Sequence, residues 1–477
     1  MKKILSIIAV FFCAIALVSC LDVSDITSLE FDKAPEGVYV QGCTPVKADK
    51  FTVKVTMTSG EDTFDLLSPE LLVQGLKGDY IDTDEPGQKV IKVSYKGLTI
   101  TFNYVVVPKE GYKATKWVDS AEETVELVGD VYQVSSPEDL AFFAKRTREE
   151  NGNLKIKLTQ DIDLTGKLWT PIEAKSADFD GANHKVIGLT IDDVQDTTID
   201  DDNGLFGYLP NGVSTFKDAV FENVSLRCKD HKNIGTLVGH SYSTLIFNNI
   251  DVIDFDIHAM GRAGSLAGFN EGDDQLNKVI DCYAEGSLTA YNPVTISTDD
   301  GEGDKIGGFI GHTYACAFEN SSVKVNIQGT RDLGGFIGYA FPDEVQEFSY
   351  TNCKVLNGTV IRASVPGGMK KDKSTRNIGG ILGTMGTLSD SKKFRQYHTF
   401  DNTIVESQVV IEKNSQYEDS SSSRIFGGYR GQANVKVTVV NEAGNKVYEQ
   451  KFVHVAPTQE YKADQSEMVK AIEALFK

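Results

Sequence analysis

Aromatic and histidine side chains recur after a repeated glycine phrase, and they are the residues in this sequence best suited to holding a ligand. They stand one or three residues beyond the last glycine of successive copies, at Tyr208, His240, Tyr242, Phe269, His312, Tyr314, Tyr339 and Phe341. Positions one and three of a strand point the same way. If the copies stack, the rings form a stripe along one face, where sugar rings could bind by apolar and stacking contact. The simpler alternative is that the rings fill the interior or a buried corner and stabilise the stack.

Acidic side chains gather in three places, and one of them has a spacing that could serve a metal ion. The phrase Asp300-Gly-Glu302-Gly-Asp304 alternates acid and glycine and could wrap around calcium, the one cofactor that the sequence suggests. It does not complete a calcium loop, because the twelfth position from Asp300 is Gly311 and not glutamate. All three places fall in expected insertion loops, where solvated acids are common. The other two clusters are 200–202 and 273–274.

The sequence lacks the motifs that mark common hydrolase and phosphate-binding sites. None of its seven histidines stands in the His-Glu-x-x-His motif of zinc peptidases. Gly-x-Ser-x-Gly and Walker-type phosphate loops are absent as well. The remaining enzymatic alternative is a polysaccharide lyase or glycoside hydrolase, which needs paired carboxylates or a calcium site beside a base. We therefore expect a non-enzymatic protein with no catalytic residues.

The first twenty residues carry the features of an export signal. Two lysines precede an apolar run over 4–18, which is shorter than the roughly 20 residues that span a bilayer as a helix. The run ends at Leu17-Val-Ser-Cys20, which resembles the lipobox of bacterial lipoproteins. The resemblance implies that 1–19 is a signal peptide and that Cys20 carries acyl chains such as palmitate. It predicts an exported protein held by lipid at the outer membrane or cell surface.

The composition indicates a folded, acidic protein of two or more domains. Of the 477 residues, 40% are hydrophobic, and 43 glycines stand against 12 prolines. The formal net charge of −20 argues against nucleic acid as a partner, since few cations remain to neutralise phosphates. It also argues against a polybasic grip on anionic lipid, which leaves the acyl chains to hold the protein. No Cys-x-x-Cys spacing occurs, so zinc ribbons and redox motifs are not expected.

Residues 20–108 alternate apolar and polar residues in short runs that predict strands. In Phe51–Met57, Ile91–Tyr95 and Thr99–Val107, every second residue can face a core. Short strands in a domain of this size predict a small β-sandwich. The stretch 85–102 resembles the closing hairpin of bacterial Ig-like domains, which mostly act as spacers on surface proteins. A polar linker is expected over 109–130.

The stretch 131–434 repeats two phrases, which indicates one structural unit used many times. The glycine phrase occurs at 204–207, 235–239, 264–268, 307–311, 334–338 and 379–383, with a degraded copy at 427–431. The second phrase places asparagine or aspartate after an apolar residue, at 221–226, 247–252, 280–283, 318–323 and 350–353. The uneven spacing of the copies predicts loops of different lengths inserted at one side of a fixed unit.

A right-handed parallel β-helix accounts for this pattern. Each coil is one circuit of short strands, and neighbouring coils pair about 4.8 Å apart, so like residues stack. Aliphatic residues in the middle of each glycine phrase would point inward, while the glycines allow close packing on the next coil. The asparagines suit turns, because asparagine tolerates left-handed backbone geometry. A propeller or a chain of small sheets is the competing interpretation, disfavoured because the units lack a hairpin turn.

The repeats resemble the GLUG motif, a glycine-rich repeat of bacterial surface adhesins and some secreted peptidases. The segment 179–189 is similar to the opening of such β-helices, and Ser136-Pro137 before it predicts a short capping helix. The resemblance implies extracellular display and adhesion-like roles, and it supplies no catalytic residues. Over 435–477 we expect a hairpin followed by an amphipathic helix.

Together these features predict an all-β protein with an N-terminal Ig-like β-sandwich, a parallel β-helix and short capping helices. The expected function is that of a lipid-anchored adhesin, which binds a glycan or a host or neighbouring-cell surface without chemistry. The alternatives are a carbohydrate-active β-helix enzyme and a structural stalk of a surface assembly. Exposed acids and bases converging in one groove would favour the enzyme, while a flat aromatic or polar face would favour the binding protein.

Overall fold

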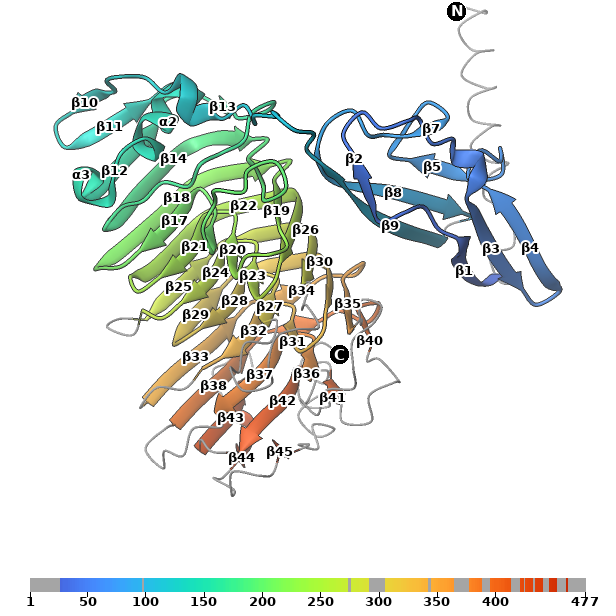
Figure 1. Cartoon of the computed structure of the whole chain (residues 1–477). Coiled ribbons are helices and arrows are strands. Elements are labelled where there is room, and N and C mark those ends of the chain that lie inside the picture. The colour runs from blue at the N-terminus through green and yellow to red at the C-terminus, as the bar shows by residue number, and fades with distance from the viewer. Residues whose placement is uncertain are drawn as a thin grey trace, which may run out of the picture. The chain divides into compact units, whose positions relative to one another are not determined.

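The computed structural model (Figure 1) describes two compact units, Met1–Lys113 and Ala114–Lys477, which are treated separately below. Described residues are 26–96, 98–272, 276–290, 305–341, 345–363, 377–387, 395–412, 421–423, 425–431, 434–440, 446–452 and 460–461. Three features expected from the sequence lie outside these ranges: Cys20 with its signal peptide, the acidic phrase from Asp300 to Asp304, and the helix near the C-terminus. Within the ranges, no helix is long and apolar enough to cross a membrane.

The first unit consists of short strands around one hydrophobic core. A three-stranded sheet has the order β1-β3-β4, and a four-stranded sheet has the order β2-β9-β8-β5. Alternate residues such as Val53, Val55, Ile91 and Val93 are fully buried, as the period-two pattern predicts. The strands are β1 Ile26–Lys33, β2 Val38–Val40, β3 Thr52–Met57, β4 Gly60–Asp65, β5 Leu72–Gln74, β6 Leu76–Lys77, β7 Tyr80–Ile81, β8 Gly87–Tyr95 and β9 Leu98–Val107.

The second unit is built from three sheets, and almost all of its strand pairs are parallel. In the described part of the chain, the long sheet has 21 strands, a second sheet has seven and a third has eight. The long sheet comprises β10 Glu126–Val128, β11 Val131–Val134, β12 Asn153–Leu158, β13 Ile162–Asp163, β14 Ser176–Ile187, β15 Thr190–Asp192, β18 Val213–Glu222, β19 Ser225–Cys228, β22 Thr244–Ala259, β25 Asn277–Ile280, β26 Tyr283–Ala290, β29 Cys316–Glu319, β30 Ser322–Gly329, β33 Val345–Thr351, β34 Lys354–Val355, β35 Val360–Ala363, β38 Arg395–Asp401, β39 Ile404–Val405, β40 Val410–Glu412, β43 Asn434–Val440 and β44 Lys446–Phe452.

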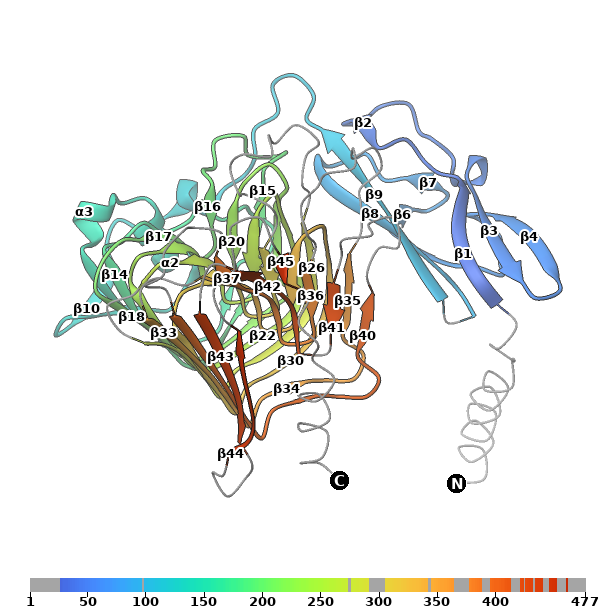
Figure 2. The ribbon, with the colours of Figure 1, turned by 90° about the horizontal axis from the view of Figure 1, so that it is seen from below.

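The two smaller sheets take one short strand each from successive circuits of the chain, and β45 adds an antiparallel strand at the end of the larger of the two. The seven-stranded sheet comprises β16 Asp202–Asn203, β20 Asn233–Gly235, β23 Arg262–Gly264, β27 Lys305–Gly307, β31 Asp332–Gly334, β36 Asn377–Gly379 and β41 Ser421–Ser423. The eight-stranded sheet comprises β17 Phe206–Leu209, β21 Val238–Ser241, β24 Ala267–Asn270, β28 Ile310–Thr313, β32 Ile337–Ala340, β37 Leu382–Thr387, β42 Phe426–Gly431 and β45 Glu460–Tyr461. Figure 2 shows successive strands of a sheet lying behind one another.

Like residues therefore stack from one circuit to the next, as the repeats predict. Phe216 pairs in register with Phe247, and their ring centroids are 5.3 Å apart in a stacked arrangement. Tyr350 and Phe400 stack in the same way at 4.7 Å. Each ring buries its area on the ring above and below, so the core grows by one layer per circuit.

The glycine phrases form the corner between the two smaller sheets. Their middle residues point into the core and are fully buried, at Leu205, Leu237, Leu266, Phe309, Phe336 and Ile381. The last glycine of each phrase lies against the backbone of an adjacent strand. At Gly311, a Cβ atom would stand 2.6 Å from the nitrogen of Ala263 and from the carbonyl oxygen of Gly268. Only glycine therefore permits this approach of the two sheets.

The seventh glycine phrase is not at 427–431 as expected. Phe426 pairs with Leu382, which places Gly427 opposite Gly383, the last glycine of the preceding phrase. The first position of the seventh phrase is Ser423, which pairs with Gly379. The expectation was wrong by four residues, because it followed the glycines and not the buried apolar pair before them.

Left-handed asparagines mark the bend within the long sheet, as expected from the second phrase. Asn249, Asn320 and Asn352 have φ of 55°, 50° and 55°. The Nδ2 of Asn352 donates to Oδ1 of Asn320 at 3.0 Å, and Asn402 donates to Asn352 at 2.7 Å. The side chains thus form a hydrogen-bonded column that supports the same turn in successive circuits.

The first circuits are closed by a helix and a hairpin. Helix α2, Pro137–Ala144, begins where Ser136 accepts a hydrogen bond from the Asp139 backbone, and it buries Phe143 completely. Strand β10 pairs antiparallel with β11, a hairpin that the sequence did not indicate. At the other end β43 pairs antiparallel with β44, as expected. The second unit also contains α3 Arg148–Asn151 and the 3-10 turn η3 Trp117–Ser120. The first unit contains the 3-10 turn η2 Ala48–Lys50.

The interval 109–130, expected to be a linker, contributes to the second unit from Ala114 onward. Trp117 is buried there, and its Nε1 donates to the carbonyl of Leu164 at 2.9 Å. Trp117, a single large apolar side chain in a polar stretch, could have indicated that this segment packs against a core, because a buried indole with a hydrogen bond holds the backbone around it in place.

We expect Gly311→Ala to destabilise the second unit by about 1–3 kcal/mol, the usual cost of forcing extra atoms into a packed core. The reason is that the new Cβ would meet backbone atoms at 2.6 Å, and these cannot rotate away. Urea unfolding followed by circular dichroism measures the change. Gly37→Ala is the matched control, since nothing lies within 4 Å of its Cβ position. Equal stability of the two variants would contradict the proposed role of the corner glycines.

His398 predicts a loss of stability in acid. Its ring stacks on Phe348 at 4.7 Å, and burial lowers the pKa of His398 to about 3. Unfolded histidine titrates near 6.5, so between about pH 6.5 and pH 3 the unfolded chain binds the extra proton. The free energy of unfolding should fall with decreasing pH there, by up to about 1.4 kcal/mol per pH unit from this group. His398→Phe keeps the stack and should flatten that slope in denaturant titrations at several pH values, whereas an unchanged slope would refute the assignment.

Candidate functional site

The eight-stranded sheet brings the ring residues predicted from sequence into one column, here called the ring column. Tyr208 pairs with His240, His240 with Phe269, Phe269 with His312 and His312 with Tyr339, and Thr384 follows Tyr339 in register. Centroid distances between successive rings are 5.0, 4.8, 4.5 and 4.9 Å. These distances match one ring per circuit, so the sheet register alone places the column.

The exposure of the column changes along its length. Phe269, His312 and Tyr339 are 6%, 6% and 3% exposed, while Tyr208 and His240 are half-buried. Phe269 and Tyr339 are buried but do not belong to the main hydrophobic core. The rings in the middle of the column therefore fill a buried corner and stabilise the stack, which is the simpler of the two alternatives raised by the sequence. The Tyr208–His240 end reaches solvent.

The three rings predicted at the third position after the glycine lie beside the ring column. Tyr242 is 46% exposed, and its centroid is 5.0 Å from His240 and 6.0 Å from Tyr208. Tyr314 and Phe341 are half-buried and 5.4 Å apart. Tyr242 is thus the most exposed of the eight predicted ring residues, and it stands at the accessible end of the column.

A polar column that sequence reasoning missed faces the rings. It consists of the first residues of strands in the seven-stranded sheet, namely Asp202, Asn233, Arg262, Lys305, Asp332 and Asn377, which pair in register. Arg262 lies 4.1 Å over the ring of Phe269 and Lys305 lies 5.7 Å from that of Tyr339, so both make cation–π contacts. All six residues stand two positions before a glycine phrase, and this shared position was the available signal. It was hard to see because the residues differ in type.

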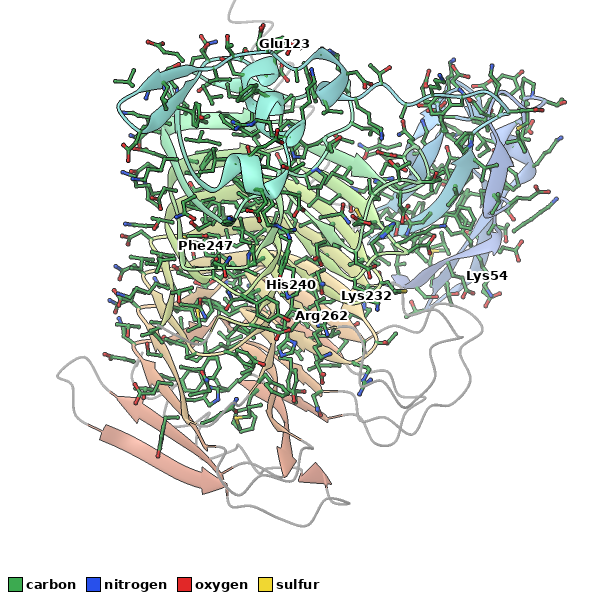
Figure 3. The ribbon with its side chains drawn as sticks, turned by 60° about the vertical axis from the view of Figure 1, so that its left-hand side comes forward. Lys54, Glu123, Lys232, His240, Phe247 and Arg262 are labelled. Atoms are coloured by element: carbon green, nitrogen blue, oxygen red, sulfur yellow. The ribbon has the colours of Figure 1, made fainter. Side chains whose placement is uncertain are left out.

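His240 connects the two columns at the exposed end, where Figure 3 labels it near Arg262. Its Nδ1 is 3.4 Å from the Asp202 carboxylate, and its Nε2 is 3.8 Å from the carboxylate of Glu271. Asp202 also accepts a hydrogen bond from Asn233 at 2.6 Å. Burial lowers the pKa of His240, but the two carboxylates outweigh burial, so this pKa is raised above its usual value.

Other charged groups enclose the Tyr208 end of the ring column. The guanidinium of Arg148 lies 4.6 Å over the ring of Tyr208 and forms an ion pair with Glu173. Burial raises the pKa of Glu173, and Arg148 opposes that effect without cancelling it. Burial also raises the pKa of Tyr208 and of Tyr242, and Glu271 adds to the second shift.

The protonation states at this end leave hydrogen-bond donors and acceptors around one exposed ring. Both nitrogens of His240 face carboxylates, which favours the imidazolium, and an imidazolium has no lone pair with which to act as a base. Tyr208 and Tyr242 keep their phenolic protons at neutral pH because their pKa values are raised. The exposed end therefore offers an aromatic ring, hydroxyl groups and carboxylate acceptors, which together suit a polyhydroxylated ligand.

The described residues offer no group of three or more acidic, histidine or cysteine side chains that could hold a metal ion. The calcium phrase Asp300, Glu302, Asp304 lies outside those residues. In the acidic cluster 200–202, Asp201 is 3.7 Å from Nδ1 of His231, and Asp202 belongs to the pair with His240. Neither is arranged around a shared centre.

The sequence was compared with known proteins, and no protein-family model and no curated protein matches it.

Removal of both carboxylates should lower the pKa of His240 below its usual value, because burial would then act alone. The variant Asp202→Asn with Glu271→Gln tests this by NMR titration of histidine ring protons, with the His240 signal assigned from His240→Gln. Asp161→Asn serves as control, since Asp161 faces His184 at 3.2 Å and should leave His240 unchanged. If His240 titrates equally in both variants, the carboxylates do not set its protonation.

Proposed function

We propose that this chain is a lipid-anchored cell-surface protein that binds a glycan through the exposed end of the ring column and does not cleave it. The observation that carries the proposal is Tyr242, which is 46% exposed and contacts Tyr208 and His240. An exposed ring held in place by other rings loses little entropy when it binds a flat apolar face. Carboxylates beside it supply acceptors for hydroxyl groups.

The proposal includes the architecture that the sequence resembles. The parallel register of the three sheets in the second unit supports a right-handed β-helix of the GLUG type. The shared core of two small sheets in the first unit supports an Ig-like spacer. On the same resemblance, Cys20 bears the lipid anchor and the protein is displayed at the outer membrane or cell surface. A display protein with a rigid repeat and a short spacer suits adhesion.

Glycan cleavage is the competing function, because acids and a histidine do converge near Tyr242. The Asp202 and Glu271 carboxylates are both directed at His240, within 3.4 and 3.8 Å. Both carboxylates thus face one histidine and do not flank an open space in which a glycosidic bond could lie between them, as a hydrolytic pair does. The cluster therefore supports a binding surface better than a hydrolytic pair.

The test is binding of the full chain, purified in detergent, to a broad glycan array, with bound polysaccharides then incubated and sized by chromatography. We expect saturable binding without shortening of the glycan, and at least a tenfold loss of affinity, about 1.4 kcal/mol, in Tyr242→Ala. Tyr80→Ala is the matched control, because Tyr80 is 43% exposed in the first unit. Shortened chains would establish the enzyme instead, and a complete lack of binding would favour the structural stalk.

A further inference from the structure

Glu271 interrupts the outer line of rings beside the ring column. It stands three residues past Gly268, the position that Tyr242, Tyr314 and Phe341 take in other circuits. The residues directly before these positions pair in register, Ser241 with Asn270 and Asn270 with Thr313. A carboxylate therefore lies between two tyrosines in neighbouring circuits.

The carboxylate of Glu271 and the ring of Tyr242 open to solvent at the same place. The Glu271 side chain is 23% exposed and the Tyr242 side chain is 46% exposed. Burial raises the pKa of Tyr242, and the charge of the nearby Glu271 carboxylate raises it further. Both groups are held from behind, since His240 lies 5.0 Å from the ring of Tyr242 and 3.8 Å from Glu271.

We propose that Tyr242 and Glu271 form a subsite for one sugar ring of an uncharged polysaccharide that runs along the stacking direction of the circuits. This inference rests on the proposed glycan-binding function and names its ligand class. The apolar face of the sugar lies on Tyr242, and its hydroxyl groups donate to the Glu271 carboxylate, a charge-assisted hydrogen bond. Tyr314 lies two circuits from Tyr242, about 9.6 Å away by strand spacing, and it contacts a second sugar ring further along the same polysaccharide.

Charge selects the class of polysaccharide. An acidic glycan would bring a carboxylate against Glu271, the group that its hydroxyl groups would otherwise contact, and like charges at close range are repelled. The cations nearby are already engaged: His240 lies between Asp202 and Glu271, Arg148 pairs with Glu173, and Arg262 lies over Phe269 and donates to Asn233. The formal net charge of −20 extends that repulsion over the whole surface. An uncharged chain meets neither barrier and keeps the hydroxyl groups that the carboxylate accepts.

The test uses isothermal titration of the full chain in detergent with cellohexaose, laminarihexaose and mannohexaose as uncharged probes and with hexagalacturonate as the acidic probe. We expect at least one uncharged probe to bind and hexagalacturonate not to bind. Glu271→Gln should weaken the uncharged probe roughly tenfold, since it replaces a charge-assisted hydrogen bond with a neutral one. Glu319→Gln, an exposed acid on the long sheet, is the matched control and should bind like the unaltered chain.

The outcomes separate this inference from the proposed function. Hexagalacturonate binding as tight as that of the uncharged probes, and lost in Tyr242→Ala, would overturn the ligand class and leave glycan binding intact. Uncharged-probe binding that Glu271→Gln does not weaken would overturn the subsite in the same way. Near-ultraviolet circular dichroism identifies a misfolded variant, for which Glu271→Asp then replaces Glu271→Gln, with a loss of binding again expected. No binding of any of the four probes would overturn the inference that the ligand is an uncharged polysaccharide, and the glycan array would then decide the proposed function separately.

Discussion

The close approach of two backbones at the glycine corner is the constraint on which the second unit depends. At the last position of each phrase, a Cβ would meet backbone nitrogen or oxygen atoms, as at Gly311 and Gly427. This contact sets the separation of the seven-stranded and eight-stranded sheets. It also holds their registers together, because from Gly239 onward each last glycine lies against a strand of the preceding circuit. The apolar residue two positions before it, such as Phe309 or Phe336, is then directed into the core.

The ring column and the polar column follow from that register. A residue two positions before a phrase and a residue one position after it end up facing each other across the corner, as Arg262 and Phe269 do. The same corner geometry thereby accommodates a buried charged group in one circuit after another. Asp332 is fully buried and accepts a hydrogen bond from Thr384 at 2.5 Å. Where the columns reach solvent, at His240 and Tyr242, the same arrangement becomes a surface that can receive a ligand.

The sequence predicted those features that repeat with a fixed offset. The strands of the first unit, helix α2, the left-handed asparagines and the register of Tyr208 to Tyr339 all follow from local periodicity or from the copies. Arg262 and Glu271 were missed, because unlike residues occupy the equivalent positions of the other circuits. Asp202 was noted only as part of an acidic loop, whereas the structure places it at the start of β16. Exposure could not be predicted either, since Phe269 and Tyr208 occupy the same position. Their difference arises from neighbouring circuits, which no single copy contains.

The direction of the backbone hydrogen bonds has a mechanical consequence. In the second unit they lie along the stack, from β14 to β18 to β22 and onward, and the strands themselves run across it. A force pulling the two ends of the stack apart breaks the hydrogen bonds between one pair of neighbouring circuits before those of the next pair. The circuits at the ends of the stack pair with a neighbour on one side only, and α2 and the β10–β11 hairpin lie at one of these ends. Such a chain lengthens in many small steps, and it absorbs work gradually while the remaining circuits stay folded.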